Sequence, residues 1–230
     1  MTDFLGIAEK AFLVTGFANR KSVAWHVSEI LEQEGAKIIY TVRSQKRRTE
    51  LLALKPDAEI LVCDFEKAHD IDSLGSYLKS KGNNSIHGVL HSIAFANYSE
   101  GLKPFHETNV KDYLQATQIS SFSLVELANA CKPALQKDAS VVTIGISSID
   151  VTAENYGYMA PIKASLEANV RYLAKSFSAF SSLIFLFSSL VKLFNSLFSS
   201  KNLVLLSSKI CNSSLIKFNF ICSVLEKSSA

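Results

Sequence analysis

The stretch AFLVTGFANRKSVAWHV, residues 11–27, joins an apolar strand to a helix and decides the predicted fold. The strand, 11–16, ends at Gly16, and residues 22–34 then carry apolar side chains on one helical face. Ser22 stands near the start of this helix, where a hydroxyl can cap unpaired N–H groups. We therefore expect a strand, a glycine turn and a helix in direct succession.

The same alternation of apolar strands and helical stretches continues to residue 177. Further strands are predicted at 37–43, 59–65, 88–95 and 140–147, and further helices at about 70–80, 109–132 and 159–177. Nearly continuous apolar strands separated by helices indicate a parallel sheet that is covered on both faces. The predicted class is therefore α/β, a doubly wound, Rossmann-like parallel sheet, which binds ligands beyond the carboxyl ends of its strands.

The composition changes abruptly after Phe177. All nine glycines and all four prolines occur by Pro161, and the chain then becomes rich in serine, phenylalanine and leucine. We divide the chain into an α/β domain, 1–177, and a low-complexity segment, 178–230. A shifted reading frame is the favoured explanation of this segment. A membrane anchor over the uncharged run 177–191 and a divergent folded segment are the alternatives.

Charge and cysteine content exclude several classes of function. Residues 176–230 hold five lysines and one glutamate, which gives +4, so the remaining residues carry −1 of the total +3. No nucleic-acid partner is expected from such a balance. The four cysteines have no metal-ligand spacing, so we expect reduced thiols and no metal. The N-terminus shows no export signal, which favours a cytoplasmic location without a membrane partner.

The ends of the predicted strands suggest a dinucleotide site. At Gly16 a backbone without a side chain could approach a diphosphate at the helix N-terminus, although an ordinary glycine turn capped by Ser22 explains this pattern equally well. Asp64 closes the third strand, where it could accept from an adenine amine. The small residues of HSIAFA, 91–96, would let a cofactor lie against the backbone. We expect His91 to be a structural polar group.

The residues after the second strand indicate the type of cofactor. Arg43 is followed by further basic residues, and no acid occurs before Glu50. An arginine here accommodates a ribose 2′-phosphate, whereas an acid would bind the 2′-hydroxyl of NAD. The pattern favours NADPH over NADH, and a solvated basic loop is the alternative.

The stretch YGYMAPIKASLEANVRY, 156–172, offers a phenol and an ammonium group to this site. Pro161 fits only in a first helical turn, so the helix begins near 159–161 and Lys163 lies early in it. If helical geometry extended backwards, Tyr156 would lie nearly two turns away on the same side as Lys163. Tyr158 would point elsewhere, so Tyr156 is the candidate for chemistry.

The segment NYGYMAPIKASLEANVRYLAKSFS resembles the active-site helix of the enoyl-acyl-carrier-protein reductases, in the short-chain dehydrogenase/reductase superfamily. In this family six residues separate the tyrosine from the lysine, whereas three do so in most of the superfamily. The segments GFANRKSVA, CDF, HSIAFA and QISSFSLVELANACKP resemble the family in the same order. The resemblance covers about residues 5–178.

The resemblance implies NADPH- or NADH-dependent reduction of the 2,3 double bond of an enoyl thioester on acyl carrier protein, in fatty-acid biosynthesis. Tyr156 would hydrogen-bond the enolate oxygen, and Lys163 would bind the nicotinamide ribose. Ala96 would face the substrate. A homotetramer is implied as well. The cofactor positions carried over are Gly16, Ser22, Val23, Arg43, Asp64, Phe65, Ile93 and Lys163.

Two departures from the family affect the expected activity. Ile146 stands where many members have a second tyrosine, and Ser147 and Ser148 nearby could hold a carbonyl or merely cap the strand. After residue 178 the family's sixth strand, proline–glycine cofactor loop, substrate lid and seventh strand are not recognisable. We therefore expect inherited sites with little or no activity. The alternatives are a short-chain dehydrogenase acting on a 3-oxo thioester or an alcohol, and a non-catalytic nucleotide-binding remnant.

Overall fold

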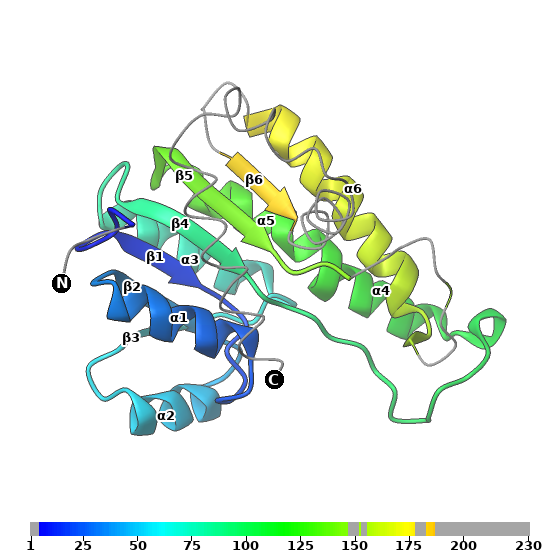
Figure 1. Ribbon diagram of the computed structural model, residues 1–230. Coiled ribbons are helices and arrows are strands. Elements are labelled where there is room, and N and C mark those ends of the chain that lie inside the picture. The colour runs from blue at the N-terminus through cyan, green and yellow to red at the C-terminus, as the bar shows by residue number, and fades with distance from the viewer. Residues whose placement is uncertain (1–4, 147–151, 153–155, 178–182, 187–230) are drawn as a thin grey trace, which may run out of the picture.

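The computed structural model describes residues 5–146, 152, 156–177 and 183–186, which form a parallel sheet with helices on both faces (Figure 1). The strand order is β3-β2-β1-β4-β5-β6, and every neighbouring pair is parallel. The strands are β1 (Ala11–Val14), β2 (Lys37–Val42), β3 (Glu59–Val62), β4 (Ile86–His91), β5 (Leu135–Thr143) and β6 (Leu183–Leu186). The direction of winding reverses between β1 and β4, so ligand binding is expected beyond the carboxyl ends of these two strands.

Two apolar cores hold the helices against the sheet. The helices are α1 (Val23–Gln33), α2 (Gln45–Leu54), α3 (Ala68–Ser80), α4 (Val110–Thr117), α5 (Ser123–Cys131) and α6 (Met159–Phe177), with a 3₁₀ turn η1 (Phe105–Glu107) and a π-helical turn η2 (Gln118–Phe122). One core joins α1 and α2 to one face, and the other joins α3, α5 and α6 to the opposite face. The predicted doubly wound α/β fold is confirmed.

The helix α6 agrees with its sequence pattern. It spans Met159–Phe177, and Pro161 lies in its first turn, where a missing N–H costs nothing. Its apolar stripe, which includes Leu166 and Val170, is buried in the core that it shares with α3 and α5. Among the described residues, no helix is long and apolar enough to cross a membrane.

Three elements differ from the sequence-based expectation. The basic stretch after β2 is not a loop but the helix α2, which begins at its cap Ser44 and buries Leu51. The single helix predicted over 109–132 is divided by the π-helical turn η2. A π-turn widens the backbone hydrogen bonding locally without an obvious change in side-chain pattern.

The third difference is the strand β6, which lies in the segment whose composition predicted no recognisable strand. Its backbone pairs in parallel with β5, from Ser140 beside Leu183 to Thr143 beside Leu186. The sequence there is LIFL, and β-branched and aromatic side chains favour strands. The other residues of 178–230 lie outside the described part of the chain, as do Ser147 and Ser148.

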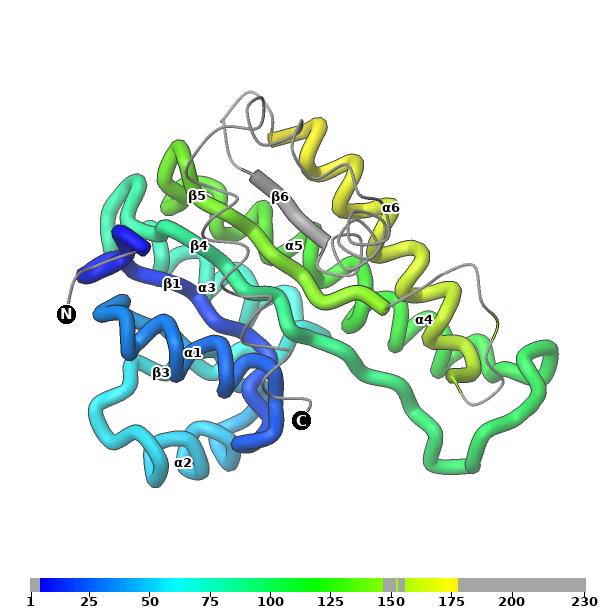
Figure 2. Tube along the Cα trace, in the orientation of Figure 1, coloured from blue at the N-terminus to red at the C-terminus, as the bar shows by residue number. Residues whose placement is uncertain are grey.

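Figure 2 shows that the connection from β4 to α4 runs away from the sheet before it returns. This connection carries Ala96 and Tyr98, two residues that pack at the edge of a third apolar cluster with Tyr158 and Met159. The start of α6 and the long connection are therefore held together outside the sheet.

Candidate active site

A cleft of about 150 Å³ lies at the carboxyl ends of the strands where the winding reverses. Of the predicted cofactor residues, Gly16, Arg43, Asp64, Phe65 and Ile93 all line it. These five residues follow four different strands, β1 to β4, and the fold alone brings them together. Ser22, Val23, Lys163 and Ala96 do not line this cleft.

Gly16 is required by the packing between β1 and β4. Its φ is +83°, and a Cβ atom there would lie far closer than 3.0 Å to the carbonyl oxygen of Ser92. Beside it, the Thr15 hydroxyl donates to the Leu90 carbonyl at 2.9 Å and accepts from the Ser92 N–H at 3.3 Å. The turn that opens the cleft therefore lies directly on the backbone after β4.

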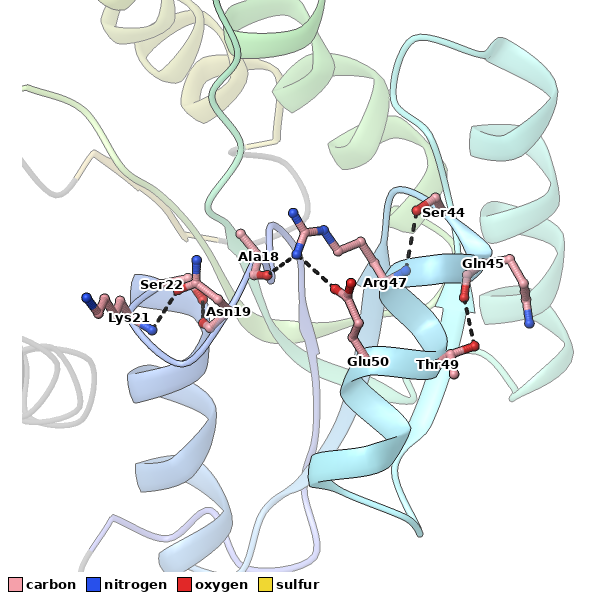
Figure 3. Close-up of polar contacts among 9 residues, drawn as sticks. All are labelled: Ala18, Asn19, Lys21, Ser22, Ser44, Gln45, Arg47, Thr49 and Glu50. Carbon is pink, nitrogen blue, oxygen red and sulfur yellow. Dashed lines mark hydrogen bonds and ion pairs between the residues drawn. The ribbon is translucent and has the colours of Figure 1, made fainter.

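Ser22 caps α1 with its side chain. The hydroxyl accepts from the Trp25 N–H at 3.3 Å. It donates to the Asn19 carbonyl at 2.7 Å (Figure 3). The structure thus shows the capping role that the sequence left open, with Val23 as the first helical residue. The remaining N–H groups and the positive end of the helix dipole favour an anion at this terminus.

Arg47 connects α2 to the glycine turn. Its guanidinium donates to the Ala18 carbonyl at 2.8 Å and to the Glu50 carboxylate at 2.9 Å (Figure 3). Arg43 lies closer to the cleft, with its guanidinium carbon 6.0 Å from the centre of the Phe95 ring. Of these two arginines, Arg47 is therefore already paired with an acid, whereas Arg43 faces the cleft.

A wider cleft of about 590 Å³ adjoins the first and shares Arg43, Asp64 and Phe95 with it. The carboxylate of Asp64 accepts from the Glu66 N–H at 3.2 Å and lies 3.9 Å from the ammonium group of Lys67. Asp64 is thus held by its own turn at the boundary between the two clefts.

Lys163 is buried at the carboxyl end of β5. Only 4% of the residue is exposed, and its ammonium group donates to the Ile144 carbonyl at 2.8 Å. Burial lowers the pKa of Lys163 to about 8. A cation held in this way would exert a strong local field, because little water screens it.

His91 is enclosed next to this lysine. Its Nδ1 lies 2.7 Å from the Thr143 hydroxyl and its Nε2 lies 2.8 Å from the Ser123 hydroxyl. Ser123 donates its own proton to the Ile119 carbonyl, so His91 donates through Nε2 and accepts at Nδ1. Burial, with a smaller contribution from the charge of Lys163, lowers the pKa of His91 to about 3. His91 is therefore neutral, as expected of a structural group.

The two tyrosines before α6 have different surroundings. Tyr158 is 6% exposed, its hydroxyl donates to the Asn97 carbonyl at 2.9 Å, and its ring packs against Tyr98. Tyr156 is 37% exposed, and its hydroxyl makes no hydrogen bond to another residue of the described ranges. Burial, and secondarily Tyr98, raises the pKa of Tyr156. Of the two phenols, only that of Tyr156 remains available to a ligand.

The helical continuation assumed in the sequence argument is absent. Tyr156 lies in a turn before α6, and Gly157 has a φ of +53°, which breaks the helical path. The Tyr98 hydroxyl donates to the carbonyl of Tyr156 at 3.0 Å and holds this turn. A residue of the long connection therefore fixes the Tyr156 backbone.

The π-helical turn η2 places buried hydroxyls against the same segments. The Ser120 hydroxyl accepts from the Phe95 N–H at 2.7 Å and donates to the Phe95 carbonyl at 2.8 Å. The Ser121 hydroxyl donates to Ser165 of α6 at 3.0 Å. The turn thus holds both the cleft wall after β4 and the helix that carries Lys163.

Several cleft residues were not among the predicted cofactor residues. Thr41, Cys63, Ser92 and Phe95 also line the smaller cleft. The alternation of side chains along a strand, together with adjacency to a strand end, could have identified Thr41 and Cys63. No group of metal-binding side chains occurs in the described ranges of the chain.

The chain is similar to known proteins over most of its length. The family model described as enoyl-(acyl carrier protein) reductase matches residues 16–181. The enoyl-(acyl-carrier-protein) reductase (NADPH) of Staphylococcus aureus is 36% identical over 176 residues, which cover 74% of this chain and 68% of that protein. The corresponding reductase (NADH) of Bacillus subtilis is 34% identical over 167 residues, 70% of this chain and 64% of that protein. The chain thus spans about two thirds of the length of these relatives.

Solved structures agree with this likeness. The Bacillus cereus enoyl-acyl carrier protein reductase with NADP⁺ and indole naphthyridinone has a TM-score of 0.72 and 31% identity, over 78% of this chain and 71% of that one. A reductase of the same name from Anaplasma phagocytophilum in complex with NAD has a TM-score of 0.70 and 26% identity, over 76% of this chain and 68% of that one.

Proposed function

We infer the function of this chain from one premise: it belongs to the enoyl-(acyl carrier protein) reductase family, within the short-chain dehydrogenase/reductase superfamily. We propose that it binds NADPH or NADH and reduces the 2,3 double bond of an enoyl thioester carried by acyl carrier protein. The observation that carries the proposal is the convergence of five predicted cofactor residues, from four strands, on one cleft. The relatives named for NADPH and for NADH support a nicotinamide cofactor.

The residues of the site would contribute hydrogen bonds and charge to the reaction. The nicotinamide, when bound, supplies hydride to the β-carbon of the enoyl group, and the electron pair of the double bond moves onto the thioester oxygen. A proton from water would then add at the α-carbon as the carbonyl re-forms, which gives the saturated thioester. Tyr156 would donate a hydrogen bond to that oxygen as its negative charge develops, which lowers the barrier rather than tightening substrate binding. Lys163 would bind the nicotinamide ribose hydroxyls, and its buried charge would stabilise the same anion. Ala96 would border the substrate.

The remaining cofactor contacts would follow from the turn and strand ends. The diphosphate would approach Gly16 and the N–H groups of α1 near Ser22 and Val23. Asp64 would accept from the adenine amine, beside Phe65, and Ile93 would form the wall on the β4 side. These assignments rest on position and chemistry.

We further propose a preference for NADPH. Arg43 faces the cleft without a carboxylate partner among the described residues, and Ser44 follows it. Arg47, by contrast, is neutralised in part by Glu50. A 2′-phosphate would therefore meet one available guanidinium, which supports a modest preference. Titration calorimetry with NADPH and NADH tests this, and tighter binding of NADH would overturn it.

The activity itself is tested by a single-turnover experiment with protein in excess over NADPH and crotonyl thioester. We expect oxidation of NADPH with formation of butyryl thioester, and no reaction with a 3-oxo thioester or an alcohol. Reaction with the 3-oxo thioester alone would favour the other short-chain dehydrogenase reading. Cofactor binding without either reaction would favour a non-catalytic remnant.

We also propose that residues 178–230 limit the rate of steady-state turnover. The sequence there lacks the glycine and proline of the family's cofactor loop. A chimera that joins residues 1–177 to the matching C-terminal third of the Staphylococcus aureus relative should turn over at least 100-fold faster than the native chain. Equal rates would show that 178–230 does not limit the reaction. The homotetramer implied by the family is checked on both proteins by light scattering.

A further inference from the structure

Two threonines at the ends of neighbouring strands have the same burial but different surroundings. Thr15 follows β1 and is 0% exposed, and Thr41 lies in β2 and is 1% exposed. The Thr15 hydroxyl donates to the Leu90 carbonyl and accepts from the Ser92 N–H. The buried hydroxyl oxygen of Thr41 makes no hydrogen bond within the described part of the chain. A buried hydroxyl without a partner costs free energy, so natural proteins seldom retain one without a role.

The strand geometry directs Thr41 toward the cleft face of the sheet. Side chains alternate along a strand, so Thr41 points to the same face as Ile39. Ile39 packs in the core that contains Cys63 and Phe65, whereas the intervening Tyr40 packs in the opposite core. Thr41, Cys63 and Phe65 all line the cleft of about 150 Å³. The unpartnered hydroxyl is therefore located at the wall of the proposed cofactor site.

Few polar groups of this cleft wall could replace that hydroxyl. Phe65 and Ile93 are apolar parts of this wall. The other side-chain donors that line the cleft are the Ser92 hydroxyl and the guanidinium of Arg43, which is proposed to bind the 2′-phosphate. Burial raises the pKa of the Cys63 thiol to about 12, so this group stays neutral and is only a weak donor. Asp64 is a carboxylate at the cleft boundary, which accepts but does not donate.

We propose that the Thr41 hydroxyl binds the adenine end of the dinucleotide by donating a hydrogen bond to a ring nitrogen of the base. This inference rests on the proposed function and extends it by one residue. Asp64 would accept from the amine of the base and Thr41 would donate to the ring, so the two groups together would match the donor–acceptor pattern of adenine. An adenine nucleotide would then satisfy the hydroxyl that the protein leaves unpaired.

The isosteric variants Thr41→Val and Thr15→Val test this with matched burial. For Thr41→Val we expect the dissociation constants of NADPH and ADP to rise about 10-fold, while the urea midpoint of the ligand-free protein is unchanged or higher. For Thr15→Val we expect a lower urea midpoint, because the Ser92 N–H loses its acceptor and the Leu90 carbonyl loses one of its two donors, keeping the backbone N–H of residue 15. Reduced nicotinamide mononucleotide, which has no adenine, should bind Thr41→Val as it binds the native protein.

A second pair of variants isolates the hydroxyl if valine disturbs the strand. Thr41→Ser keeps the hydroxyl and Thr41→Ala lacks it, so we expect serine to bind ADP several-fold more tightly than alanine. Equal ADP affinity of this pair, or of native protein and Thr41→Val, would overturn the inference, as would a lower urea midpoint of ligand-free Thr41→Val. If native protein bound no adenine nucleotide, the proposed function would fail instead, and this inference with it.

Discussion

The two ends of the candidate site depend on different kinds of interaction. At the nucleotide end, Gly16 lies against the backbone of Ser92, and the fit depends on the absence of a side chain. At the catalytic end, Lys163 and His91 are buried polar groups, held by the Ile144 carbonyl and by neighbouring hydroxyls. One end depends on shape and the other on charge and hydrogen bonding.

This difference separates stability from activity. Close backbone contact cannot accommodate an added atom, so a side chain added at Gly16 should mainly affect folding. A buried ammonium group is costly to desolvate, so the fold gains little from Lys163, and its burial with a lowered pKa makes it a candidate for binding or catalysis. The variants below test whether the two ends can be distinguished in this way. Rates refer to single turnover, or to the chimera.

The largest effect is expected for Gly16→Ala. Its Cβ would overlap the Ser92 carbonyl oxygen, so we expect a loss of more than about 4 kcal/mol in the free energy of unfolding. Gly101→Ala is the matched control, because Gly101 has a φ of +84° and nothing within 4 Å of its Cβ position. Its loss should be about 1–2 kcal/mol. Similar urea midpoints for both variants would contradict the close-contact argument.

Lys163→Met should have the opposite effect to Gly16→Ala and lower the reduction rate more than the stability. We expect the reduction rate to fall about 10²–10³-fold, roughly 3–4 kcal/mol of transition-state stabilisation. The free energy of unfolding should change by less than about 2 kcal/mol, because removal of a buried charge offsets the lost hydrogen bond to Ile144. Arg171→Met, on the exposed side of the same helix, should alter neither quantity. Unfolding of Lys163→Met at low urea would show that Lys163 is needed for folding as well as for activity.

Variants of the two tyrosines should separate activity from stability in the same way, with smaller effects. Tyr156→Phe should lower the reduction rate about 10–100-fold and leave the urea midpoint unchanged, because its hydroxyl has no partner in the described ranges. Tyr158→Phe should cost about 1–2 kcal/mol of stability, because the Asn97 carbonyl loses its donor. If Tyr158→Phe impaired the reduction more than Tyr156→Phe, the assignment of the phenol would be wrong.

The pH dependence of the free energy of unfolding should reveal the lowered pKa of Lys163. Its pKa is about 8 in the folded protein and about 10.4 in an unfolded chain. Between these values the unfolded state binds the additional proton, so this group makes the free energy of unfolding rise with pH, by up to about 1.4 kcal/mol per unit. Because Cys63 and Cys131 have raised pKa values and act in the opposite sense, the difference between native protein and Lys163→Met is measured. A difference independent of pH from 8 to 10 would refute the lowered pKa.

The smallest effect is expected at the cap of α1. Ser22→Ala removes the side-chain acceptor of the Trp25 N–H, which keeps only the carbonyl of residue 22, at 3.0 Å in the native protein. The loss of this cap should cost about 1 kcal/mol in urea unfolding. Ser22→Asp, which can also cap the helix, should restore stability but weaken binding of a diphosphate by charge repulsion. Unchanged nucleotide affinity of Ser22→Asp would place the diphosphate away from this terminus.

Elements of the fold that show a clear pattern of side chains were predicted best from the sequence. The stripe that includes Leu166 and the position of Pro161 gave α6 its observed bounds, and Gly16 marked the turn. The helix α2 was missed because its apolar residues are consecutive, 51–54, rather than spaced at the helical period, and only Leu51 is buried. The turn η2 was missed because a change of backbone hydrogen bonding has no side-chain period.

The site was predicted in part for the same reason. Strand ends identified Arg43 and Asp64, since parallel strands bring their carboxyl ends to one edge. The alternation of side chains could have placed Thr41 at the cleft, but its lack of a hydrogen-bond partner is recognised only when its surroundings are known. Tyr156 was reached by extending a helix that Gly157 interrupts, so its relation to Lys163 depends on tertiary contacts that a local pattern does not contain.

The enclosed imidazole of His91 has a spectroscopic consequence. Its Nε2–H is hydrogen-bonded to Ser123 and fully buried, so it should exchange slowly with solvent and give a resolved downfield proton resonance. Because the ring remains neutral down to about pH 3, ordinary buffers would not shift this signal by protonation. The proton resonance of His91 would therefore report by NMR on the hydroxyls around the ring, without substrate or turnover.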